Sequence, residues 1–140
     1  MIDIENLIVD KVNCAVKRCF PEAKVESMFI EQPKTFPFVS VMESDNYTHR
    51  PTQDGSLEDH AVNVMYTVSI YANDAQKKTT AKRIADIVDD VMLTNLFTRT
   101  MRMQVPNLDR SIYRIELRYT AVVAAPKSDG VVTVYQMYRR

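Results

Sequence analysis

The sequence predicts an α+β fold, with a mixed, mainly antiparallel sheet and two helices packed on one of its faces. Apolar and polar residues alternate between Val62 and Tyr71, which is the two-residue period of a half-buried strand. From Ala81 to Met92 the apolar spacing becomes that of a helix, and the strand period returns from Tyr113 to Val123. A helix placed between two such strands is expected to pack on one face of their sheet.

The length and charge of the chain suit one soluble globular domain over residues 1–140. A chain of 140 residues can bury a core of its own. The formal net charge is zero, so no strong field is expected that would gather nucleic acid or anionic lipid. The N-terminus, MIDIENLIVDK, carries acids before its apolar residues, which argues against a signal peptide or a membrane span. We therefore expect synthesis in a cytosol and no membrane partner.

The N-terminal segment has the spacing of a helix. Asp3 is a suitable N-cap, Pro21 closes the segment, and the helix should run to about Phe20. Cys14 and Cys19 lie five residues apart on it and point to different faces, which favours two buried, reduced thiols over a disulfide. The residues expected to face the core are Ile4, Leu7, Ile8, Val12, Ala15 and Cys19.

Two strands and a long polar loop should follow. The strands are expected over Val25–Glu31 and Phe38–Glu43, joined by the turn from Pro33 to Pro37. Residues 44–60 form the longest polar stretch, and we interpret them as the mobile tip of a hairpin that leads into the strand Val62–Ala72. Such loops often carry function, although a plain surface loop is the alternative.

The second helix is predicted to begin at Asn73, with Gln76 three residues later in a weak capping-box pattern. Its basic residues gather in the first half and its aspartates in the second, against the helix dipole. Tertiary packing or a partner could hold such a helix, and a solvated charged face is the simpler alternative. The remaining strands are expected over Arg99–Val105, Ile112–Val123 and Val131–Tyr138, so the order is helix, three strands, helix, three strands.

Little in the sequence suits catalysis, and we expect neither enzymatic activity nor a cofactor. Glycine occurs only at Gly55 and Gly130, which excludes a glycine-rich phosphate loop. No Cys-x-x-Cys or His-x-x-x-His pair supports a zinc site, and no nucleophile-elbow sequence is present. Asp89 and Asp90 are adjacent on a helix and cannot share a substrate. A metal site could draw only on one loop group without regular spacing, formed by His49, Asp54, Glu58, Asp59 and His60.

A row of charges is the main candidate for a contact surface. Arg110, Arg114 and Arg118 should share one strand face with Glu116. The row is either a solvent-facing salt-bridge ladder or a face docked on a neighbouring subunit, and the interleaved glutamate disfavours sequence-specific nucleic-acid binding. The full set of candidate contacts to other subunits or to a tube is Tyr47, His49, Arg50, Asp54, Glu58, Lys77, Lys78, Arg110, Arg114, Glu116 and Arg118.

A family resemblance covers about residues 20–124. It is carried by the run VMYTVSIYANDAQKKTTAKRIADIVDDVM and by LFTRTMRMQVPNLDRSIYRIELRYTAVV after it, together with the earlier turn QPKTFPF. These segments resemble the small neck and tail-completion proteins of siphophages and prophages, and the order of elements is similar to the tail-terminator type. The pattern positions are Gln32, Pro33, Phe36–Phe38, Ile70–Asn73, Asp89, Met92, Phe97, Arg99, Pro106, Asn107, Ile112–Arg114, Arg118 and Tyr119.

The resemblance implies a tail-terminator-like domain in a non-enzymatic virion protein. Such a protein would be made in the bacterial cytoplasm, would form a hexameric ring, and would cap the tail tube or join the tail to the head. Its partners would be further copies of itself, the tail tube protein and the head–tail connector proteins, and the genome would pass through the ring.

Two alternatives stay open. One is a head-side neck adaptor or minor capsid protein, and the other is a small α+β ligand-binding, enzymatic or regulatory domain. The segment Val131–Arg140 has no place in the family pattern.

Overall fold

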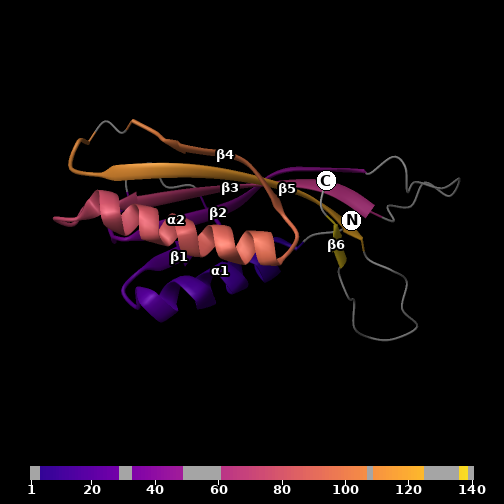
Figure 1. The fold of residues 1–140 in the computed structure, drawn as a ribbon, viewed down its shortest axis with the longest axis horizontal. Coiled ribbons are helices and arrows are strands. Elements are labelled where there is room, and N and C mark those ends of the chain that lie inside the picture. The colour runs from indigo at the N-terminus through magenta and orange to yellow at the C-terminus, as the bar shows by residue number, and fades with distance from the viewer. Residues whose placement is uncertain (1–3, 29–32, 49–60, 107–108, 125–135, 139–140) are drawn as a thin grey trace, which may run out of the picture.

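The computed structural model describes residues 4–28, 33–48, 61–106, 109–124 and 136–138 (Figure 1). Over these residues the order of elements is helix, three strands, helix, three strands, as the sequence predicts. The elements are α1 (Glu5–Cys19), β1 (Lys24–Glu26), β2 (Phe38–Thr48), β3 (Ala61–Ala72), α2 (Lys77–Thr94), β4 (Thr98–Gln104), β5 (Tyr113–Ala124) and β6 (Gln136–Tyr138).

The strands form one mixed sheet in the order β1-β2-β3-β5-β4, and β6 pairs with β5 beyond this path. Only the β1–β2 pairing is parallel, and the other pairings are antiparallel. Both helices lie on the same face of the sheet (Figure 1). The predicted α+β fold with two helices on one face is therefore confirmed.

The core lies between the helices and the sheet face that they cover. The even-numbered residues of β3 from Val62 to Ile70 are all buried against the helices, as predicted. Asn63, Ser69 and Tyr71, on the other face, are buried as well, so the strand is not half-buried as expected. The apolar stripe of α2 packs on these residues. Each fully buried valine, isoleucine or methionine side chain contributes about 1.5–3 kcal/mol to the stability of the fold. The buried residues of the two helices are Ile8, Val12, Val16, Ala81, Ile84, Ala85, Val88 and Met92.

The opposite face of the sheet, called the open face below, carries no helix or strand in the described part of the chain (Figure 1). The strand register sets its side chains in rows. One row runs Ser40, Ser69, Glu116, Met103, and the next runs Met42, Thr67, Arg118, Met101.

Helix α1 departs from the prediction at its start and in its cysteines. It begins at Glu5, Ile4 occupies the N-cap position without a side-chain cap, and Asp3 lies outside the described residues. Cys14 and Cys19 are exposed, so the expectation of buried thiols is wrong, and Leu7, which was expected to face the core, is exposed as well. The buried stripe instead repeats every fourth residue and ends at Val16, which turns both cysteines away from the sheet.

Helix α2 begins at Lys77 rather than at Asn73, and Gln76 makes no side-chain cap. Residues 73–76 form a turn instead. There the Asp74 carbonyl accepts the Lys77 N–H, and the Asp74 carboxylate accepts the Thr80 hydroxyl at 2.8 Å. The backbone bond closes the turn, and the bond from the Thr80 hydroxyl ties the Asp74 side chain to the first turn of the helix.

Strand β2 is longer than predicted. It continues to Thr48, so residues 44–48 of the expected loop belong to the strand, while residues 49–60 lie outside the described part. A bulge between Glu43 and Asp45 takes up one extra residue, and pairing with β3 then resumes. Polar residues can continue a strand here because the paired valines of β3 supply the apolar side chains.

Two further boundaries differ. Strand β1 ends at Glu26, so Ser27 and Met28 lie beyond it, and residues 29–31 of the predicted strand fall outside the described residues. Arg110 lies in the turn before β5 and not on the strand with Arg114 and Arg118. In β6 only Gln136–Tyr138 are described, so most of the segment Val131–Arg140 stays untested.

Candidate surface for assembly

Strand β5 places three of the candidate residues side by side on the open face. The Glu116 carboxylate lies 3.3 Å from the Arg118 guanidinium and 3.8 Å from that of Arg114. The side chains of Arg114 and Glu116 are only 18% and 15% exposed, whereas that of Arg118 is 47% exposed. The Arg114 guanidinium also lies 5.2 Å from the centre of the Tyr71 ring, a cation–π distance.

These charges line a shallow groove of about 200 Å³ on the open face, formed with Ser40, Met42, Thr67 and Ser69. Two guanidinium groups face one carboxylate, so the row has a formal surplus of one positive charge. The groove brings together hydroxyl and guanidinium donors that can hold a carboxylate of another molecule. No side chain in it forms a nucleophile–base pair.

The remaining described candidates lie elsewhere. The Lys77 ammonium donates to the Arg110 carbonyl at 2.9 Å, which ties the start of α2 to the turn before β5. Lys78 is exposed beside it, and Tyr47 is exposed near the end of β2 on the open face. The predicted contacts His49, Arg50, Asp54 and Glu58 lie outside the described residues, as do the other members of the loop group considered for a metal.

The turn before β5 is held by Asp109. Its carboxylate accepts both the hydroxyl of Ser111, at 2.6 Å, and the Ser111 N–H, at 2.9 Å. These two hydrogen bonds, the hydroxyl first, hold the pKa of Asp109 below its usual value. The described part of the chain contains no group of three or more metal-binding side chains, and no described helix meets the length and hydropathy needed to cross a membrane.

A polar cluster that sequence reasoning missed joins β4 to α2. The Arg99 guanidinium contacts the Asp89 carboxylate at 3.0 Å, and that of Arg102 contacts Asp86 at 2.9 Å. The buried Tyr119 hydroxyl donates to the other Asp89 oxygen at 2.8 Å. Burial first, and then this hydrogen bond, raise the pKa of Tyr119 above its usual value.

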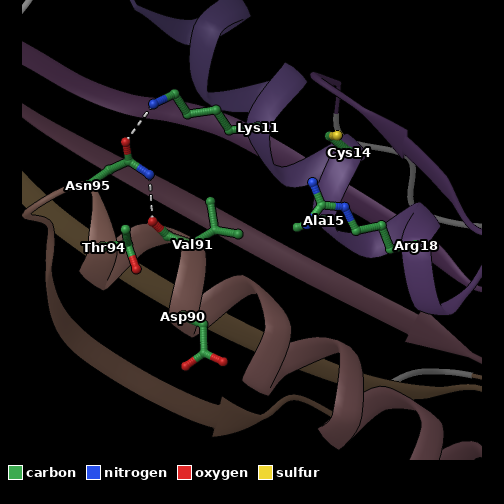
Figure 2. Close-up of a pocket in the computed structure, with 8 residues that line it drawn as sticks. All are labelled: Lys11, Cys14, Ala15, Arg18, Asp90, Val91, Thr94 and Asn95. Carbon is green, nitrogen blue, oxygen red and sulfur yellow. Dashed lines mark hydrogen bonds between the residues drawn. The ribbon is translucent and has the colours of Figure 1, made fainter.

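The second hollow lies on the outer surface of the helices. A groove of about 370 Å³ runs between α1 and α2, and Figure 2 shows the residues that line it. Lys11 reaches across it from α1 and donates to the side chain of Asn95 at 2.7 Å. Arg18 and Asp90 also line it, and neither makes an ion pair within the described residues.

Comparison with known proteins finds a likeness among solved structures and none among sequences. No protein-family model and no curated protein sequence matches the chain. Among the solved structures that are similar to it is the sheath/tube terminator of an extracellular contractile injection system (PVC), in its extended state. The identity is 11% and the TM-score 0.45, and the match covers 93% of this chain but only 63% of the other.

Proposed function

We propose that this chain is a non-enzymatic structural protein of a phage-type tail, which self-associates into a ring that caps the tail tube or joins the tail to the head. The proposal rests first on the sequence resemblance to tail-completion proteins over residues 20–124. The α+β fold and the order of its elements agree with what that resemblance implies.

One observation carries the self-association. Arg114 and Glu116 are largely buried on a sheet face that no described helix or strand covers. Exposed salt bridges on a plain solvated face contribute little and are free to move in water. The neighbouring Arg118 guanidinium is 47% exposed beside this half-buried pair. Such a group fits a surface prepared for a partner, because a protein contact strengthens charge pairs that water would screen.

The partners proposed for this protein are further copies of itself, the tail tube protein and the head–tail connector proteins. The genome would pass through the ring without sequence-specific recognition. The proposed contacts are the open-face row with Tyr47 and the end of the molecule that carries Lys77, Lys78 and Arg110. The loop residues His49, Arg50, Asp54 and Glu58 stay part of the proposal as sequence predictions.

The solution mass tests this proposal. Light scattering over a concentration series should detect a discrete species near six times 16.1 kDa. A strict monomer at every concentration would overturn self-association in solution and favour a head-side adaptor that assembles only on its partner. Binding to purified tail tubes, compared with binding to portal complexes, then decides between the tail-side and the head-side position.

A further inference from the structure

The large exposed apolar side chains of the described residues divide between two opposite sides of the molecule. Leu7, Leu93 and Leu96 lie on the side of the helices. Met28, Tyr47 and Met103 lie on the side of the open face. Single exposed apolar residues are ordinary, but a chain with one apolar set on each of two opposite faces has the surfaces that head-to-tail association requires.

The open face is rich in methionine. Of the eight methionines in the chain, Met92 is in the core, whereas five belong to the open side. Four of them belong to the strands and lie on this face by the strand register, namely Met42, Met65, Met101 and Met103. The fifth is Met28, whose carbonyl accepts a hydrogen bond from the Ser40 hydroxyl on the same face. Methionine is flexible and polarizable, adapts to a partner surface, and is enriched in protein interfaces.

The helix side offers a complementary surface. The groove between α1 and α2 (Figure 2) has room for a side chain of methionine size. Leu93 is exposed, three residues after the lining residue Asp90 on α2. Asp90 is an exposed carboxylate without an ion pair in the described chain. Arg118 is the most exposed of the three charged residues that β5 places on the open face. Arg18 is exposed in the groove, and Asp45 is exposed on the open face. These two residues offer a second pair of opposite charges for a contact between copies.

The backbone at Leu96 gives an independent reason for a partner on this side. Its φ is 66°, in the left-handed region that favours glycine, yet its side chain is 41% exposed. Leucine therefore carries a conformational cost here, and burial within the monomer does not offset that cost. A second molecule covering the end of α2 would explain why an apolar side chain occupies the position.

We infer that the occupant of the open face is the helix side of a second copy of this chain. Methionines of the open face enter the groove between α1 and α2 of the next copy, and Arg118 pairs with Asp90 there. The inference rests on the proposed ring and specifies which surfaces form it.

Two variants separate the head-to-tail contact from the alternatives. Met103→Glu places a charge on the open face, and Leu93→Glu places one beside the groove, at side chains that are both at least one-third exposed. Each variant alone should lose the wild-type oligomer and remain monomeric. An equimolar mixture should form a one-to-one dimer, because each variant still provides one intact surface. The matched control Ala75→Glu, in the exposed turn before α2, should retain the wild-type mass.

Light scattering of the variants and their mixture is decisive in each direction. The mixture should be measured at the highest concentrations, since one contact replaces a closed ring. A mixture that stays monomeric, or a Leu93→Glu variant that still self-associates alone, would overturn the head-to-tail docking while leaving ring formation in place. A wild-type protein that is monomeric throughout would overturn both. Circular dichroism melts confirm that the variants are folded, and a variant that does not fold is replaced by Arg118→Asp or Asp90→Arg on the same surface.

Discussion

At the scale of single residues, the end of α2 shows how local chemistry and function can conflict. Phe97 donates its N–H to the Met92 carbonyl and Leu96 donates to that of Leu93, the two bonds of a Schellman motif. Met92 and Phe97 are both fully buried, which supplies the apolar contact that usually accompanies the motif. Glycine is the usual residue at the left-handed position, where this chain has leucine.

Replacing Leu96 by glycine should therefore stabilise the monomer. The left-handed conformation costs a non-glycine residue about 1–2 kcal/mol, and part of the gain is lost to the greater freedom of glycine in the unfolded chain. We expect the free energy of unfolding to rise by about 0.5–1 kcal/mol in urea titrations. The control Leu93→Gly, in the last turn of α2, should lower it by a similar amount. A destabilised Leu96→Gly protein would show that the leucine side chain supports the monomer.

Tyr119 gives the folded protein a dependence on alkaline pH. Burial and the hydrogen bond to Asp89 raise the pKa of Tyr119 in the folded state above the ordinary value of about 10, so the folded protein keeps the phenol proton when the unfolded chain has lost it. The stability that this proton supplies is complete below pH 10 and falls as the pH rises above it. Tyr119→Phe should remove this alkaline loss and cost about 1 kcal/mol at neutral pH, since Asp89 keeps Arg99. Thermal melts from pH 7 to 11 measure both effects, and an unchanged alkaline slope in the variant would contradict this assignment.

At the scale of elements, β4 explains the reversed charges of α2. The aspartates of its second half oppose the helix dipole, but Asp86 and Asp89 pair with Arg102 and Arg99 of the neighbouring strand. The sequence left open whether tertiary packing, a partner or a solvated charged face accounts for this helix. These two ion pairs favour tertiary packing. The spacing within the helix could not reveal these partners, because they follow in the chain and meet α2 only when β4 joins the sheet.

Neutralising Asp89 and Asp90 of α2 one at a time should distinguish the stability that a paired carboxylate contributes from that of an unpaired one. Asp89→Asn weakens bonds to both Arg99 and the buried Tyr119, so we expect a loss of about 1.5–3 kcal/mol. Asp90→Asn changes an exposed carboxylate one residue away and should alter the free energy of unfolding by less than about 0.5 kcal/mol. Urea titrations at low protein concentration compare the two, and equal losses would show that the β4–α2 cluster does not hold the helix.

The sequence predicted the elements that rely on periodicity and missed those that rely on local exceptions. The alternation in β3 and β5 and the apolar stripe of α2 indicate correctly which sheet face the helices cover, although residues of the other face such as Tyr71 and Thr120 are buried too. The continuation of β2 to Thr48 depends on a bulge, and the late start of α2 depends on the Asp74 turn. Neither leaves a periodic signal. For the candidate surface, the period placed Arg114, Glu116 and Arg118 on one face correctly, but it could not show that the first two are largely buried.

At the scale of the whole molecule, the two sides of the sheet have different compositions. The covered side is rich in valine and isoleucine and includes the buried Tyr66 and Tyr119. The open side combines methionines and charged side chains with the buried Phe38 and Tyr71. Rigid branched side chains suit a permanent core, and flexible methionines suit a surface that adapts on binding. In the proposed assembly, a second copy would cover the exposed part of the open face around Met103 and Arg118.

A charge exchange between the two sides tests how copies meet. Arg118→Asp alone should set like charges against Asp90 of the next copy, and Asp90→Arg alone should do so against Arg118, each weakening self-association about tenfold or more. The double variant carries the exchanged pair across every contact, so its association should recover toward that of the wild type. Both side chains are exposed, hence the folded monomer should tolerate the changes. Sedimentation equilibrium of the four proteins gives the coupling between the sites directly. Additive losses in the double variant would exclude contact between Arg118 and Asp90 and would overturn this docking.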